Sequence, residues 1–394
     1  MEAGTKKIAL IGIGNCGNQI AYLGEKKYPE LFHTVYINTS EADLNQVAIS
    51  GECMKYKIGD DEYVEGSGKN RNKAKKYLRG DIKKIVEDQK FNDTIFNMTY
   101  VFVIVSAAGG SGSGTGPVMT SILKQSFPDS NIILVGVLPN LKNSSMLELC
   151  NAMEFLDEMY TKLGPDQTYM LYDNDSVAGM PVTVGLTTVN DAIIEDIRVF
   201  SGVDCYSTPY ESIDDGDMET IITTPGRTMI MRITDNLTVK NIEDGNLDNM
   251  MIQAIKNSTN AEIDRTKKVV RWGLITYFTE EVNSLYSPSL PKLEAFIGTP
   301  TERFNHNAVN NGSDKLNFMH MIAAGLPPIN DRISKYKERI EDLKSAMSTN
   351  GTGYIMQDDD FVKKTMGELR KDDTNDAAGE DEKVKIEDIF GQFM

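Results

Sequence analysis

The sequence predicts an α/β protein in which a doubly wound parallel sheet is followed by a smaller α+β domain, a C-terminal helix and an acidic tail. Two observations support this fold class. Short runs rich in Val and Ile alternate with helical patterns through the first half of the chain, and glycine clusters fall where two of these runs end. Strands that alternate with helices form parallel sheets, which bind ligands at the carboxyl ends of their strands.

Five apolar runs are expected to be strands buried on both faces, because they are too short for helices and rich in β-branched residues. They are residues 7–13, 33–38, 100–106, 131–138 and 168–172. Helical patterns cover residues 70–90 and 144–163. A further helix should end this domain, because several apolar residues share one helical face: Val189, Ile193, Ile194, Ile197 and Phe200.

The next region has no glycine cluster. It shows strand patterns at 228–233 and 271–278 around a helical pattern at 247–259, and ends near two prolines, Pro327 and Pro328. Apolar residues then recur at helical spacing: Ile329, Ile333, Tyr336, Ile340, Leu343 and Met347. This spacing predicts a helix docked along the domain surface, with a coiled-coil strand as the alternative.

Charge and composition exclude several classes of protein. The 394 residues include 41 Lys and Arg against 58 Asp and Glu, a net charge of −17, which argues against a large direct nucleic-acid interface. No apolar run approaches the roughly 20 residues that a membrane span needs, and no signal peptide is visible, so we expect a cytoplasmic protein. The 4 cysteines and 3 histidines show no metal-ligand spacing, so no zinc site or disulfide framework is expected.

Two glycine loops follow predicted strands. Gly12 to Gly17 matches GxGxxG, which alone also fits a dinucleotide-binding dehydrogenase. That fold needs an acidic residue at the end of the second strand, where this chain has Asn38. Residues 109–116 hold 5 glycines interleaved with hydroxyls, ahead of a helix expected to start near Pro117. Such a loop can surround phosphate oxygens with backbone N–H groups, and it is not a P-loop because no GK[ST] follows.

Together these loops resemble the tubulin/FtsZ superfamily of GTPases. Gly109 to Gly114 resembles the family signature GGTGSG, residues 14–20 resemble tubulin's first nucleotide loop, and residues 37–40 are similar to the second loop of FtsZ. Residues 66–70 stand where the family has its γ-phosphate-sensing loop. Asn174 and Asn190 stand where two asparagines face guanine, whose edge an amide can read.

The resemblance implies GTP or GDP as the ligand, with Mg²⁺, and names no metal-ligating side chain. The residues implied to contact the nucleotide are Gly14, Asn15, Cys16, Gln19, Asn38, Gly66, Gly68, Lys69, Gly109, Gly110, Ser111, Gly112, Ser113, Gly114, Asn174 and Asn190. Two departures leave contacts open: Ala108 replaces the first glycine of the usual run, and Asn143 stands near where FtsZ has a ribose-contacting glutamate.

An acidic loop, residues 212–217, resembles the family motif NxDxxD. In relatives this loop enters the nucleotide site of the next subunit, where its carboxylates orient the attacking water. The resemblance therefore implies that Asp214 and Asp217 are catalytic, that copies stack head to tail, and that assembly stimulates hydrolysis of GTP to GDP and phosphate. A nucleotide-binding regulator that neither polymerises nor hydrolyses is an alternative.

Within the superfamily the chain most resembles TubZ-type tubulins of plasmids and phages, on residues 222–226, 323–328 and 386–390. This resemblance implies a GTP-binding domain with the central helix at 1–205, an activation-type domain at 206–328, a helix at 329–349 and a tail at 350–394. It also implies filaments that segregate plasmid or phage DNA through a small DNA-binding adaptor, without direct nucleic-acid or membrane contact. A phage spindle that positions viral DNA is the nearest alternative.

The tail carries 12 acidic and 6 basic residues, and we expect it to be disordered. Its end is apolar, at Val384, Ile386, Ile389, Phe390 and Phe393. The sequence thus predicts a mobile segment that docks on a basic adaptor or on the next subunit. Truncation at Asn350 is expected to leave GTP binding intact. The replicon, the adaptor, the number of protofilaments and the tail's docking surface stay open.

Overall fold

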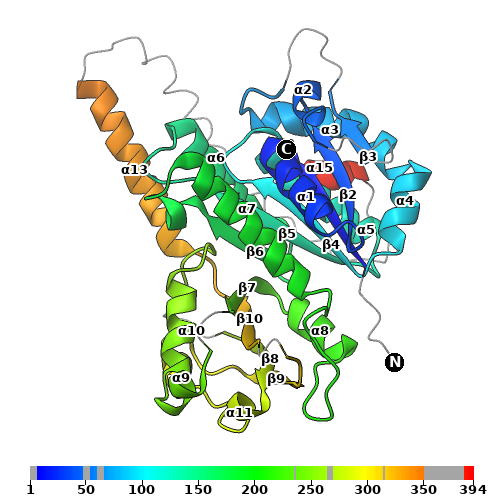
Figure 1. Cartoon of the computed structure of the whole chain (residues 1–394). Coiled ribbons are helices and arrows are strands. Elements are labelled where there is room, and N and C mark those ends of the chain that lie inside the picture. The colour runs from blue at the N-terminus through cyan, green and yellow to red at the C-terminus, as the bar shows by residue number, and fades with distance from the viewer. Residues whose placement is uncertain are drawn as a thin grey trace, which may run out of the picture.

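The computed structural model describes residues 7–47, 54–59, 66–234, 237–263, 269–313, 316–349 and 386–394. Ten strands form one sheet in the order β3-β2-β1-β4-β5-β6-β7-β10-β8-β9 (Figure 1). The pairs from β3 through β7 are parallel, and β10 runs antiparallel to β7 and β8. The predicted doubly wound parallel sheet is confirmed. The strands are β1 Ile8–Ile13, β2 Phe32–Asn38, β3 Met54–Lys57, β4 Tyr100–Ser106, β5 Asn131–Leu138, β6 Thr168–Asp173, β7 Gly226–Ile233, β8 Arg271–Thr279, β9 Glu302–Asn310 and β10 Phe318–Leu326.

Helices cover both faces of the sheet. The described helices are α1 Gly14–Lys27, α2 Glu41–Leu44, α3 Arg71–Val86, α4 Gln89–Phe96, α5 Ser111–Ser126, α6 Met146–Thr161, η1 Asn174–Val177, α7 Val182–Val199, α8 Asp215–Ile222, α9 Val239–Glu243, α10 Leu247–Lys256, α11 Glu280–Asn283, α12 Pro291–Ile297, α13 Asn330–Thr349 and α15 Ile386–Phe393. Successive strand residues face opposite sides, so Ala9 and Ile11 join one cluster while Ile8 and Leu10 join the other.

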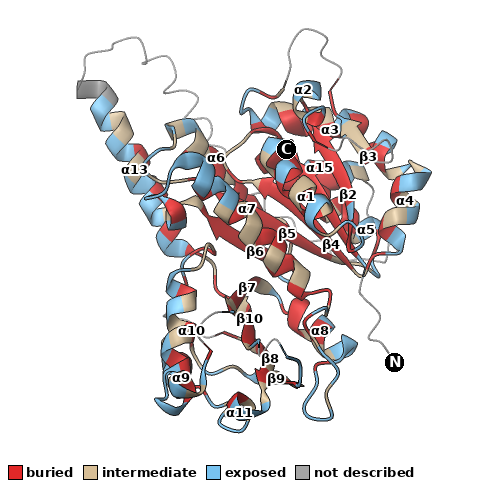
Figure 2. Cartoon of the chain, viewed as in Figure 1, coloured by how far each residue is buried: buried red, intermediate tan, exposed pale blue. Residues whose placement is uncertain are grey.

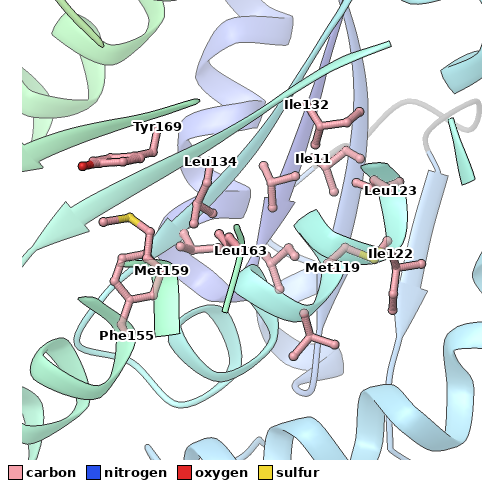
Figure 3. Packing of buried hydrophobic residues seen from close by; sticks show 14 of the residues in the cluster. Ile11, Met119, Ile122, Leu123, Ile132, Leu134, Phe155, Met159, Leu163 and Tyr169 are labelled. Atoms are coloured by element: carbon pink, nitrogen blue, oxygen red, sulfur yellow. The ribbon is translucent and has the colours of Figure 1, made fainter. Parts of the chain in front are cut away.

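The first cluster lies between the sheet and helices α3, α4, α5 and α6, with α13 and α15 contributing. Figure 3 shows part of it, where Met119 and Ile122 of α5 lie with Leu134 of β5 and Phe155 of α6. The second cluster lies under α1 and α7 on the other face. Figure 2 shows the result: buried strands between helices whose outer sides are exposed.

The second half of the chain continues the same sheet, because Thr168 and Tyr169 of β6 pair with Gly226 and Arg227 of β7. It nevertheless has a core of its own, a cluster centred on Trp272 that draws only on residues between Met229 and Leu326. The predicted strands and helix of this region are present as β7, β8 and α10. Strands β3, β9 and β10 and helix α4 were not predicted from the sequence.

The predicted start of the helix near Pro117 is wrong. Helix α5 begins six residues earlier, at Ser111, and contains Pro117 in its interior. Proline has no N–H for the carbonyl four residues earlier, Ser113. That carbonyl instead accepts a 3.0 Å hydrogen bond from Nη2 of Arg71, and the hydroxyl of Thr115 donates to the Ser111 carbonyl at 2.7 Å. The hydroxyl-bearing loop residues are therefore the first turns of a helix.

The helix predicted after Pro328 is α13, and it packs against α6 as a docked helix. Of its predicted apolar face, Ile329, Tyr336 and Ile340 are buried, while the side chain of Met347 lies outside the described residues. The expectation of disorder at 350–385, Val384 included, also falls outside them. Residues 386–393, by contrast, form helix α15 docked on α5 of the same chain, so the predicted mobile apolar end is wrong for this segment.

Candidate functional site

Two helix N-termini meet at the carboxyl edge of the sheet. Helix α1 follows β1 and helix α5 follows the loop after β4; neither has a side-chain N-cap or an acidic residue in its first turn. They lie close together, since a Cβ on Gly14 would be 3.1 Å from the nitrogen of Gly112. Uncapped helix N-termini present N–H donors and partial positive charge. Two side by side form a site suited to a phosphate chain.

Some of the glycines are required by close packing around this edge. A Cβ on Gly17 would lie 2.0 Å from the carbonyl oxygen of Ile104, and one on Gly112 would lie 2.7 Å from that of Ile13. Gly109 and Gly68 differ, because an added Cβ there meets no atom within 4 Å. The first pair brings helices and strands into contact, whereas Gly109 and Gly68 face open space where a ligand could lie.

The turn at residues 66–70 completes the edge. Gly66, Gly68 and Lys69 all have positive φ, 61° for Lys69, a conformation that non-glycine residues rarely adopt. Hydroxyls join this turn to two other loops: the Ser111 Oγ lies 2.7 Å from Thr39 Oγ1 and 3.2 Å from Ser67 Oγ. The loops that follow β2, β3 and β4 are therefore linked through Ser111.

Asn151 of α6 fixes two of these loops, because its Nδ2 lies within hydrogen-bond distance of the carbonyls of Lys69, Ala108 and Gly109, at 2.9, 3.2 and 3.1 Å. Lys69 also pairs with Glu148 at 2.8 Å. Although burial alone would raise it, hydrogen bonds from Lys69 and Ser145 hold the pKa of Glu148 below its usual value. The turn is thus held from α6 as well as from the sheet.

The remaining predicted residues of the first two loops lie at the same edge. Asn15 and Gln19 are exposed on α1 and hydrogen-bonded to each other at 3.1 Å. Burial raises the pKa of the Cys16 thiol to about 12, so this cysteine is protonated at neutral pH and not a nucleophile. Asn38 ends β2 and accepts a hydrogen bond from the Thr39 amide at 2.8 Å.

The two asparagines expected to face guanine come from neighbouring elements. Asn174 opens η1 after β6, Asn190 lies on α7, and α7 contacts both η1 and α1. The Oδ1 atom of Asn174 is buried without a protein hydrogen-bond partner. A ligand N–H group could satisfy it, as the amino edge of guanine would.

Arg332 of α13 holds the turn that carries Asn174. Its guanidinium bonds Asp173 at 2.8 Å, the Asp175 carboxylate, and the carbonyl of Pro139 at 2.9 Å. Burial raises the pKa of Asp173 to about 6, although Arg332 acts in the opposite direction. The turn that carries Asn174 is therefore fixed by a helix more than 150 residues further along the chain.

The acidic loop lies at the opposite edge of the sheet from these loops. Asp214 is the N-cap of α8 and forms a capping box with Asp217, with hydrogen bonds of 2.8 and 3.1 Å between their side chains and amides. Burial, together with the nearby carboxylates of Glu219 and Asp215, raises the pKa of Tyr100, the first residue of β4. The 7 residues of β4 separate this tyrosine from the glycine loop by roughly 20 Å.

The geometry thus gathers the predicted residues from Gly14 to Gly114 at one edge and leaves Asp214 and Asp217 at the other. Two residues that sequence reasoning missed also build the site: Arg71, which donates to the Ser113 carbonyl, and Asn151, which holds the carbonyls of Lys69 and Gly109. A polar residue on the apolar face of an amphipathic helix was the available signal for Asn151. No group of three or more His, Cys, Asp or Glu side chains within the described residues could hold a metal ion.

Comparisons with known proteins agree with this geometry. Residues 7–180 match the Tubulin/FtsZ family, GTPase domain. CetZ of Pyrococcus furiosus is 29% identical over 227 residues, 55% of this chain and 58% of that protein. TubZ of Clostridium botulinum C phage is 23% identical over 377 residues, 92% of each. The chain spans about half the length of the CetZ relatives that it matches.

Among solved structures, a GTPγS-bound protofilament of CetZ2 from Haloferax volcanii superposes with a TM-score of 0.68 at 17% identity, covering 86% of this chain and 99% of that one. This similarity shows a shared fold. CetZ and TubZ proteins both match, so the comparisons do not single out the TubZ branch. None of the described helices combines the length and apolar character that crossing a bilayer requires.

Proposed function

Because residues 7–180 match the Tubulin/FtsZ family, GTPase domain, we propose that the chain binds GTP at the carboxyl ends of β1 and β4. We propose further that it hydrolyses GTP between two copies stacked head to tail. This proposal rests on the separation between the helix N-termini that would bind phosphate and the acidic loop. The phosphate-binding helix N-termini and the acidic loop lie at opposite edges of one sheet (Figure 1). One chain cannot bring them together, whereas a second copy stacked end to end can.

In this arrangement the N-termini of α1 and α5 bind the phosphates, and the side chains of Asn174 and Asn190 read guanine. Asp214 and Asp217 of the next copy orient the attacking water, which is the main contribution that phosphoryl transfer asks of a protein. When bound, Mg²⁺ would neutralise phosphate charge, held mainly by phosphate oxygens and water because no carboxylate cluster is present in the described residues.

Apolar surface at both edges supports the stacking. Val182, at the start of α7 near Asn174, is 74% exposed, and Tyr210, beside the acidic loop, is 59% exposed. Exposed apolar residues of this size are typical of interaction surfaces when they cluster, and Met180 and Val184, two residues before and after Val182 in the sequence, are also exposed. A contact between two different surfaces does not close on itself, so repeated stacking gives a filament.

The filaments would segregate plasmid or phage DNA in the cytoplasm. This part rests on the TubZ relative that aligns over 92% of the chain. The net charge of −17 favours a basic adaptor protein over direct DNA contact. A phage spindle would use the same filament. The CetZ similarity favours a second candidate, a cytoskeletal filament without a DNA cargo. Loss of a low-copy plasmid from cells that lack this protein, and none from complemented cells, separates the two.

The enzymatic proposal is tested by measuring GTP hydrolysis and light scattering over a range of protein concentrations. A site shared between copies predicts a rate per molecule that rises steeply at the concentration where scattering begins. A rate per molecule that stays constant across this threshold would contradict the shared site. Scattering that does not respond to GTP would instead favour a non-polymerising nucleotide-binding regulator.

A further inference from the structure

The C-terminal helix α15 docks on the same layer of helices that carries the phosphate-binding edge. Ile389, Phe390 and Phe393 are at most 2% exposed and belong to the cluster that α5 and α6 share with the sheet. Figure 1 shows α15 (red) within the N-terminal half of the molecule, away from the end of α13 (orange). The end of the chain is therefore part of the nucleotide-binding half.

The last carbonyls of α15 meet a buried lysine. Lys75 of α3, 3% exposed, donates a 2.7 Å hydrogen bond to the carbonyl of Phe393 and also bonds the carboxylate of Glu158. A cation at a helix C-terminus satisfies carbonyls that lack helical partners. Burial lowers the pKa of Lys75 while Glu158 acts in the opposite direction. A buried ammonium depends on such partners, so α15 supplies part of what keeps Lys75 in place.

The contacts continue from Lys75 to the glycine-rich helix. The other oxygen of Glu158 accepts from Arg71, 3% exposed, and the same Nη2 atom of Arg71 donates to the Ser113 carbonyl at 3.0 Å. This is the carbonyl that Pro117 leaves without a helical donor. A chain of four contacts thus joins the end of the protein to the first turn of α5: Phe393 carbonyl, Lys75, Glu158, Arg71 and Ser113 carbonyl.

We propose that docked α15 is a positioning element for the nucleotide site, acting on the first turn of α5 through Lys75, Glu158 and Arg71. The inference rests on the proposed function, since it assigns α15 to regulation of that same site. It replaces the expectation that removing the tail leaves GTP binding intact.

The carboxylate of Glu158, which bonds both Lys75 and Arg71, explains how α15 would act on α5. When α15 leaves, Lys75 loses the Phe393 carbonyl and can turn to water, which frees the second oxygen of Glu158. A free carboxylate favours a two-bond pair with a guanidinium. Arg71 is then drawn toward Glu158 and away from Ser113, and the first turn of α5 loses the donor that replaces the missing N–H of Pro117.

The test uses hydrogen exchange of the nucleotide-free protein together with GDP affinity, below the concentration at which the protein assembles. Phe390→Ser removes a buried contact of α15, and Gln392→Ser changes an exposed residue of the same helix as the matched control. We expect Phe390→Ser to speed exchange of the amides of residues 111–116 by about fivefold and to weaken GDP binding by about fivefold, a typical coupling between sites. Gln392→Ser should leave both unchanged.

A chain ending at residue 385 should behave like Phe390→Ser, and an added peptide of residues 386–394 should restore the slow exchange. Exchange of these amides that is unaffected by Phe390→Ser and by the truncation would overturn the inference, whatever the GDP result. A full-length protein that binds neither GDP nor GTP would refute the proposed function, while the exchange data still decide whether α15 reaches the first turn of α5.

Discussion

A pair of glycine substitutions tests whether the proposed phosphate-binding edge depends on close backbone packing. Gly112 and Gly80 both lie in helices, α5 and α3, and neither has a positive φ. A Cβ on Gly112 would lie 2.7 Å from the Ile13 carbonyl oxygen and 3.2 Å from the Val105 Cβ, whereas a Cβ on Gly80 meets nothing within 4 Å. Both substitutions therefore change helix propensity, but only Gly112→Ala brings the added methyl group into close contact with neighbouring atoms.

The shared effect is the gain of helix propensity, about 1 kcal/mol for Gly to Ala. Gly80→Ala should therefore raise the free energy of unfolding by about 1 kcal/mol. At Gly112 the new methyl group forces the first turn of α5 away from the end of β1, and overpacking of this kind costs about 1–3 kcal/mol. The two variants should differ by roughly that cost, with Gly112→Ala the less stable.

Urea denaturation of both variants and the parent, followed by circular dichroism, measures these free energies, and titration with a fluorescent GDP analogue measures binding. Gly112→Ala should also bind nucleotide more weakly, because the N-terminus of α5 is displaced, while Gly80→Ala should bind like the parent. Equal stabilisation by both substitutions, with unchanged binding, would refute the close approach of the two glycine loops.

Three further changes have defined outcomes. Asp214→Asn keeps a good N-cap for α8 but removes the carboxylate, so this variant should bind GTP, assemble and then fail to disassemble. Asp214→Ala should in addition lose about 1 kcal/mol of stability, because it removes the N-cap. Loss of GTP binding in Asp214→Asn would assign the residue to another site. Folding raises the pKa of Asp173 from 3.8 to about 6, so this carboxyl contributes stability below about pH 4 that is lost as the pH rises through 6. Over this range the free energy of unfolding of the parent should fall by as much as about 3 kcal/mol relative to that of Asp173→Asn. Parallel pH profiles of the two proteins would contradict the buried carboxyl. Val182→Glu should raise the protein concentration at which light scattering begins without changing monomer stability, and an unchanged threshold would remove this residue from the contact between copies.

The sequence predicts the first part of the fold well because its signals are local. The β1, β2, β4, β5 and β6 strands are buried over nearly all their residues, so each contains a run of mostly apolar residues. Strand β9 is mostly half-exposed, with polar residues such as Asn305 and Asn307, and gives no such run. Its pairing with β8 is set by the tertiary fold, which local patterns do not report.

The candidate site was predictable where glycines and short motifs mark it, and not where distant residues support it. Arg71 donates to Ser113, and Arg332 fixes the turn of Asn174, across large separations in sequence. The start of α5 was misplaced because proline at the first helical position is the usual pattern, and here Arg71 compensates for a proline further inside. The acidic loop was found by motif, but only the structure places it near Tyr100 at the start of β4, a strand whose length of roughly 20 Å separates that tyrosine from the glycine loop.

The central claim, that hydrolysis needs groups from two copies, is tested most directly by mixing two inactive variants. Asp214→Asn has intact nucleotide loops and an impaired acidic loop. Gly109→Val has an intact acidic loop, and because a Cβ at this position meets no atom within 4 Å, its new side chain should enter the open space beside the glycine loop. Each variant alone should hydrolyse GTP far more slowly than the parent.

In an equal mixture, a Gly109→Val copy can present its intact Asp214 to GTP bound by an Asp214→Asn copy. Random stacking then predicts that GTP hydrolysis recovers to as much as about a quarter of the parent rate at the same total concentration. A mixture no more active than the sum of its two components, under conditions where both variants enter the same filaments, would contradict a site shared between copies.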